Sequence, residues 1–173
     1  MKKLKEFLIS FSDLKEGKHT YSLKANDAFF DCFEYSEVKH GSVSVEVKLH
    51  KHSTFLELEI FIQGKIETMC DRCIENFDLE IEGESKVVVK YGAKFLDEGN
   101  DIIVLPPSEN EVDISGLVYE SIMLSIPSRR IHSEEQCNAE ALKALNEIRI
   151  EEAIEESESE ESDPRWDALK KLK

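Results

Sequence analysis

The sequence predicts an α+β domain, with a mostly antiparallel sheet of about six strands followed by C-terminal helices and an acidic flexible tail. Residues 43–62 and 77–91 alternate apolar and polar side chains at period two, as half-buried strands do. Helical periodicity begins only after residue 113, and strands grouped ahead of helices are typical of α+β proteins. The chain has 173 residues, of which 40% are hydrophobic, enough for one domain with a real core.

The N-terminal third is predicted to supply short strands and an aromatic connection. Residues 5–12 and 19–25 are two strands with a turn between them, where Gly17 supplies a positive φ. Residues 27–37 are aromatic and irregular, and Cys32 is expected there as a small buried thiol.

The clearest strands are 43–49 and 56–62, joined by a turn at 50–53. His50 and His52 stand at this turn and could suggest a metal, but exposed imidazoles are the favoured interpretation because nothing places a third ligand nearby. A third strand covers 77–81, Gly83 breaks it, and 87–91 form another.

Cys70 and Cys73 lie at the connection between two long strands. A C-x-x-C can be half a zinc site, a redox pair or two packed thiols. Zinc knuckles aim both thiolates of such a turn at one ion, whereas a thioredoxin-type pair opens a helix. No helical pattern follows Cys73, so the redox interpretation ranks low.

The C-terminal part is predicted to be helical and then disordered. A polar loop, 92–111, precedes a helix capped by Asp113, and a second helix covers 139–154. The predicted organisation is a single α+β domain at 1–150, an acidic disordered linker at 151–163 and a short docking helix at 164–173, which carries Trp166. The first helix has an apolar face formed by Ile114, Leu117, Val118 and Ile122.

The charge is strongly negative and uneven. The net charge is −15, and residues 134–163 carry twelve acidic and two basic side chains. Such a surface repels phosphate and attracts a basic protein, although acidity can also serve solubility alone. Direct RNA binding is left open, and the cations to suspect for it are Lys48, Lys51, Arg72, Arg129 and Arg130.

No sequence feature indicates a membrane segment or an enzyme. No run approaches the roughly 18 apolar residues that a membrane-spanning helix needs, so a cytoplasmic protein is expected. Four cysteines do not make a disulfide scaffold in a chain of this size. There is no nucleophile elbow, phosphate-binding glycine loop or H-E-x-x-H, so no catalytic residue is assigned.

Four motifs follow one another in the second part of the chain: Cys70-x-Arg72-Cys73, Glu120-x-x-x-Leu124-x-x-Pro127, a segment with Cys137, and Asp163-Pro164-Arg165-Trp166-x-x-Leu169. Together they resemble the bacterial YceD-like family, the large ribosomal RNA subunit accumulation proteins, over roughly residues 60–172. The resemblance implies a non-enzymatic ribosome-biogenesis factor that supports large-subunit rRNA accumulation. With the negative charge, it predicts that the protein binds a basic ribosomal protein or an assembly intermediate.

Many members of that family carry a second cysteine cluster after the proline, but this chain keeps Cys137 alone. Structural zinc takes four ligands, so His132 is the candidate fourth and Cys32 an outside one. The predicted metal ligands are Cys70, Cys73, Cys137 and His132; the competing interpretation is thiols that only pack a turn. The predicted partner-binding residues are Arg72, Arg129, Arg130 and Trp166.

The alternative function is a cytosolic thiol redox or zinc-knuckle interaction protein using Cys70 and Cys73.

Overall fold

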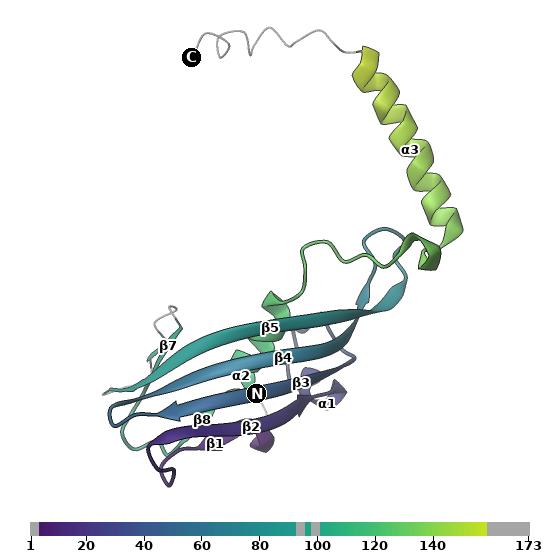
Figure 1. The fold of residues 1–173 in the computed structure, drawn as a ribbon. Helices are drawn as coiled ribbons and strands as arrows, with labels where there is room; N and C mark the ends of the chain where they lie inside the picture. The colour runs from purple at the N-terminus through teal and green to yellow at the C-terminus, as the bar shows by residue number, and fades with distance from the viewer. Residues whose placement is uncertain (1–3, 93–95, 98–100, 159–173) are drawn as a thin grey trace, which may run out of the picture. The chain divides into compact units, whose positions relative to one another are not determined.

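Four long antiparallel strands form the body of the protein, whose computed structural model describes residues 4–92, 96–97 and 101–158 (Figure 1). A short parallel strand and one more antiparallel strand extend the sheet, in the order β2-β3-β4-β5-β7-β6. This confirms the predicted sheet of about six mostly antiparallel strands. The strands are β2 Gly17–Ala25, β3 Gly41–Lys51, β4 Phe55–Met69, β5 Asn76–Tyr91, β6 Leu96–Asp97 and β7 Ile102–Leu105.

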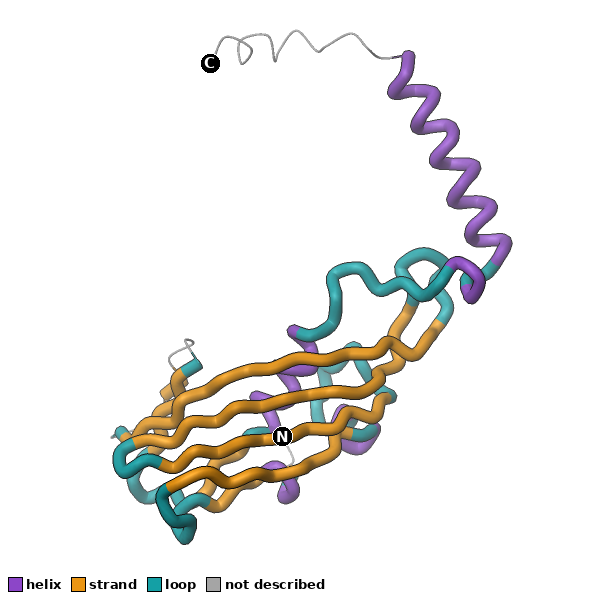
Figure 2. The backbone as a smooth tube through the Cα atoms, in the orientation of Figure 1, coloured by secondary structure: helices purple, strands orange, loops and turns teal. Residues whose placement is uncertain are grey.

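Contacts divide the chain into two compact units. The first holds residues up to 130 apart from 70–75, and the second holds 70–75 together with the chain from 131 onward. The sheet lies in the first unit, and helices cover one of its faces (Figure 2). The remaining elements of this unit are a 3-10 turn Lys5–Phe7, β1 Leu8–Ser10, α1 Asp27–Phe30, β8 Glu111–Asp113 and α2 Ser115–Leu124.

The core lies between the covered face of the sheet and α2. The alternating apolar residues of β3 and β4 point into it, as their period predicts, and Val118 and Ile122 of α2 pack against them with no exposed surface. Most outward-facing positions on the same strands are polar, with Phe61 an exception, so the opposite face meets water. The buried apolar residues of β3 and β4 are Val43, Val45, Val47, Leu49, Leu56, Leu58, Ile60, Ile62 and Ile66.

Aromatic rings join the N-terminus to both helices of this unit. The Phe29 ring lies 4.7 Å from Phe7 and 5.1 Å from Phe33, measured between centroids. Phe33 stacks on Tyr119 of α2 at 4.1 Å. The segment predicted as irregular therefore contains a short helix, α1, which Asn26 caps by accepting a hydrogen bond from the Phe29 N–H.

β1 pairs with β8 in a separate two-stranded sheet. Two sequence expectations for this unit are wrong in detail. Gly83 does not break β5, which runs without interruption; a Cβ there would lie 3.1 Å from the Ser125 Cβ, so the glycine admits the end of α2. Helix α2 begins at Ser115, because the Asp113 carboxylate accepts from the Ser115 N–H at 2.9 Å and hydroxyl at 2.6 Å. Gly17 does have the predicted positive φ, 130°.

Two expectations about ligand-type side chains are also corrected. Cys32 is only half-buried, and its thiol donates to the Ala28 carbonyl at 3.3 Å, as a thiol in a helical turn can. The expectation that no third ligand lies near His50 and His52 is wrong, because the β3–β4 register places Glu57 directly opposite His50.

In the second unit, helix α3 runs from Ala139 to Glu158, past the predicted end at 154. It therefore overlaps the beginning of the predicted linker 151–163. The predicted docking helix 164–173, with Trp166, lies outside the described residues. Among the helices that the structure describes, none is long and apolar enough to cross a membrane.

Two glycine-to-alanine substitutions should change stability in opposite directions. A Cβ at Gly64 would overlap the Ser42 carbonyl and lie 2.6 Å from the Val43 Cα, so Gly64→Ala should destabilise by about 1–3 kcal/mol. A Cβ at Gly116 of α2 meets nothing within 4 Å, so Gly116→Ala should stabilise by up to about 1 kcal/mol. Urea unfolding of the two variants beside the wild type measures both; equal midpoints would contradict the close strand approach at Gly64.

Candidate metal centre

The first half of the centre is the loop that connects β4 to β5. Their register ends with the pair Met69 and Asn76, which leaves residues 70–75 as the connection. The Cys70 N–H donates to the Glu75 carbonyl at 2.9 Å, and the Ile74 N–H donates to the Cys70 carbonyl at 2.9 Å. Ile74 adopts a left-handed φ of 64°, which lets the chain reverse in so few residues. The loop thereby buries Cys70 and Cys73, which are 1% and 8% exposed.

The second half comes from the segment that precedes α3. A 3-10 turn, Glu134–Gln136, ends at Cys137, whose N–H donates to the Glu134 carbonyl. The Nε2 atom of His132 lies 3.2 Å from the Cys73 sulfur and 4.0 Å from the Cys137 sulfur. One ligand atom from each of four residues lies within 4.8 Å of the other three. These residues are Cys70, Cys73, His132 and Cys137, the four selected from the sequence.

The spacing of this Cys3His group fits a tetrahedral metal. Zinc bonds of 2.0–2.3 Å put nitrogen and sulfur ligands roughly 3.3–3.8 Å apart, and the two distances from His132 Nε2 lie on either side of that range. The Nδ1 atom of His132 lies 3.1 Å from the Ser133 carbonyl. An Nδ1–H donating there leaves the Nε2 lone pair facing the Cys73 sulfur, the usual outer support of a histidine ligand. The Cys137 sulfur lies 3.5 Å from Nδ1 and 4.0 Å from Nε2.

Backbone N–H groups favour the thiolate forms of the C-x-x-C pair. Burial opposes ionisation of Cys70, but N–H groups of Arg72, His132 and Cys73 outweigh it and hold the pKa of Cys70 below its ordinary value. The backbone nitrogen of Arg72 is 3.4 Å from the Cys70 sulfur. Burial also opposes ionisation of Cys73, yet its pKa is lowered in the same way. The N–H groups that face Cys73 belong to Glu75 and Asn138.

The third thiol behaves differently. Burial raises the pKa of Cys137 to about 11, and the adjacent sulfurs of Cys73 and Cys70 add to the rise because a third negative charge would be repelled. A divalent cation among the sulfurs would reverse this repulsion and allow all three thiolates to form. The protein atoms alone therefore favour ionisation of Cys70 and Cys73 over ionisation of Cys137.

Arg72 is turned toward the sulfurs. Its Nη1 atom lies 4.0 Å from the Cys137 sulfur and 3.4 Å from the Glu134 carboxylate, and its side chain is 13% exposed. The guanidinium thus supplies positive charge beside the thiols, which sequence reasoning missed because it placed Arg72 toward a partner. A partner-binding role of Arg72 stays a prediction.

The other predicted partner-binding residues are not part of this group. Arg130 lies 3.6 Å from the Glu37 carboxylate in the first unit, and the Arg129 side chain is exposed. Trp166 lies outside the described residues. Their roles also stay predictions.

Asn138 is a structural residue of the centre that the sequence analysis missed. Its side-chain nitrogen donates to the Glu75 carboxylate at 3.0 Å, and its oxygen accepts from the N–H groups of Glu140 at 2.9 Å and Ala141 at 3.3 Å. Asn138 therefore caps α3 and ties the helix to the C-x-x-C loop. An Asn directly before a helical pattern is a recognised capping signal that could have revealed it.

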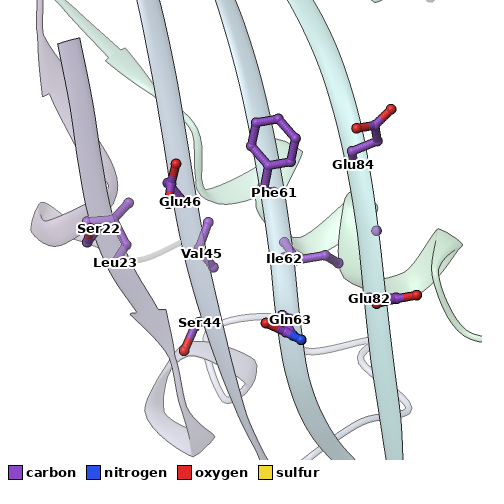
Figure 3. Close-up of a pocket in the computed structure, with 11 residues that line it drawn as sticks. Ser22, Leu23, Ser44, Val45, Glu46, Phe61, Ile62, Gln63, Glu82 and Glu84 are labelled. Carbon is purple, nitrogen blue, oxygen red and sulfur yellow. The ribbon is translucent and has the colours of Figure 1, made fainter.

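A separate depression lies on the open face of the sheet in the first unit (Figure 3). Glu46, Phe61 and Glu84 lie side by side there on β3, β4 and β5. Its lining holds three glutamates but no histidine, cysteine or lysine. The same carboxylates would repel a phosphate.

A comparison with family models decides the family. The model described as large ribosomal RNA subunit accumulation protein YceD matches residues 58–173. The chain belongs to the YceD family. No curated protein and no solved structure is a match for it. The match confirms the resemblance drawn from the sequence, and membership supports a role in the accumulation of large-subunit rRNA. YceD proteins are associated with ribosome assembly and are not a known class of enzyme. The match spans all four residues of the Cys3His group.

Substituting Asn138 should separate its two contacts. Asn138→Ala removes the cap and should destabilise α3 by about 1 kcal/mol, lowering its helicity. Asn138→Asp keeps a capping oxygen but loses the donor to Glu75, so it should keep the helicity while loosening the 70–75 loop. Circular dichroism and backbone chemical shifts measure both effects. Equal helicity in Asn138→Ala and the wild type would contradict the capping role.

Proposed function

We propose that this YceD protein is a non-enzymatic factor of large-subunit assembly that binds a basic ribosomal protein or an assembly intermediate, and that structural zinc organises its Cys3His group. The observation that carries the zinc proposal is the convergence of the four ligands within 4.8 Å, although His132 and Cys137 follow Cys73 by 59 and 64 positions in the sequence. Three thiolates and one imidazole are a complete ligand set, and a closed four-ligand site is typical of structural zinc. No open position is left for a substrate, which supports a binding role.

The charge supports a protein partner over RNA. At −15, the chain lacks the excess of cations that gives phosphate affinity. Several cations suspected of RNA contact are engaged within the protein. The Lys51 ammonium donates to the carbonyls of Phe11 at 2.8 Å and Leu14 at 2.7 Å, and Lys48 lies 4.3 Å above the Phe61 ring. A basic protein surface would instead be drawn to the acidic residues.

The zinc proposal predicts about one tightly bound zinc per chain, lost in Cys70→Ser and in Cys73→Ser because each removes one of four ligands. Metal analysis of the purified protein measures it. Cys32→Ser is the matched control, since Cys32 is half-buried and outside the Cys3His group, and it should keep the zinc. A wild-type protein purified without chelators that neither contains zinc nor takes it up would favour thiols that only pack.

A thiol redox protein is the second candidate, because the lowered pKa of Cys70 and Cys73 is also what a reactive dithiol needs. The two functions differ in what protects the thiols. Zinc-bound thiolates should resist alkylation until a chelator is added, whereas a redox pair should be alkylated at once and should cycle with a disulfide under mild oxidant. Rapid alkylation together with reversible cycling would replace the zinc proposal.

We further propose that the acidic segment 151–163 acts as an electrostatic clamp on the basic partner. Changing its glutamates to glutamine should reduce recovery of basic ribosomal proteins in pull-downs at low salt. The difference should vanish near 1 M salt, where the Debye length is roughly 3 Å. Ending the chain at residue 150 should have the same effect.

The control for the clamp removes acidic charge from the sheet, with Glu80→Gln, Glu82→Gln and Glu84→Gln on β5. This variant should recover ribosomal proteins as the wild type does. An equal loss in both variants would mean that general acidity, and not the segment 151–163, attracts the partner.

A further inference from the structure

A second group of metal-ligand side chains lies at the tip of the β3–β4 hairpin and shares no residue with the Cys3His group. His50 and His52 stand on either side of Lys51, the last residue of β3, and their ring centroids are 4.0 Å apart. The strand register brings Glu57 of β4 directly opposite His50. Two imidazoles and one carboxylate thus meet where the chain turns.

The distances indicate three groups arranged around a shared point. One Glu57 oxygen lies 3.9 Å from His50 Nδ1 and 3.8 Å from His52 Nε2, and the three ligand atoms all lie within 4.8 Å of one another. These separations are too long for hydrogen bonds. They are about half an ångström wider than the roughly 3.3 Å between light-atom ligands on zinc, so small side-chain rotations would close them on an ion.

The Nε2 atom of His52 gives the second observation. It is buried and has no hydrogen-bond partner among the described residues. Buried polar atoms are nearly always paired, so this one needs an explanation. The ring is held in place by stacking on Phe55, with centroids 4.2 Å apart and planes 20° apart. An ion between His52, His50 and Glu57 would supply the missing partner.

We propose that His50, His52 and Glu57, the hairpin site, bind a divalent cation of the zinc class. Imidazole nitrogens favour zinc, copper and nickel, whereas magnesium and calcium prefer oxygen ligands throughout. The three side chains are 36%, 31% and 41% exposed, so water completes the coordination. The hairpin site shares no residue with the Cys3His group, and its metal cross-links the ends of β3 and β4.

The test is a zinc titration of the full chain, followed by the histidine resonances in NMR. After the Cys3His group is filled, a second and weaker equivalent should shift the His50 and His52 signals. His52→Gln and Glu57→Gln should weaken this equivalent by at least about tenfold, since even outer-sphere partners of a metal are worth that much. Both variants should keep the first equivalent.

His40→Gln is the matched control. His40 also lies beside a carboxylate, 3.1 Å from Asp27, but it belongs to no group of three ligands in the described chain. Its removal should leave both equivalents unchanged. Amide spectra of each variant show whether it folds.

Cobalt in place of zinc separates the two sites, because only thiolate ligands give sulfur-to-metal charge-transfer bands. The equivalent that depends on His52 should lack these bands. The hairpin site is overturned if the wild type takes up no such equivalent, if His52→Gln and Glu57→Gln bind it as the wild type does, or if it carries thiolate bands. Loss of the thiolate-bound equivalent alone would count against the Cys3His proposal and leave the hairpin site standing.

Discussion

The long pairing of β4 with β5 is the constraint on which the rest depends. Its register runs without a break from Phe55 opposite Lys90 to Met69 opposite Asn76. The core side of these strands is fixed by buried aliphatic residues, and a shift of one residue would turn them all to water. That register also determines where the pairing stops, and so which residues form the C-x-x-C loop.

Periodicity made most of the sheet predictable, because period two with one wet face has few other interpretations. It failed where local sequence carries little information. The run 102–105 is too short to reveal that it pairs parallel to β5. Gly83 was predicted to break the strand, but the position is a glycine because Ser125 approaches the strand closely there. Both features depend on contacts between distant segments.

The ligands of the Cys3His group were selected by counting thiols and spacing, and the fold brings them together. The orientation of Arg72 could not be predicted from the sequence, because it follows from contacts with Glu134 and Cys137, which are 62 and 65 residues away. Glu57 was missed for a related reason: its position opposite His50 depends on the length of the β3–β4 turn, and a turn one residue longer would have sent it to the other face.

The 70–75 loop is continuous with β4 on one side and β5 on the other. Ordering the hairpin therefore fixes the separation of two sulfurs before any ion arrives. If the ordered hairpin binds an ion more tightly than the disordered one, linkage requires that the bound ion stabilises the ordered hairpin by the same free energy. A bound ion would then keep this end of the two strands paired for a larger fraction of the time.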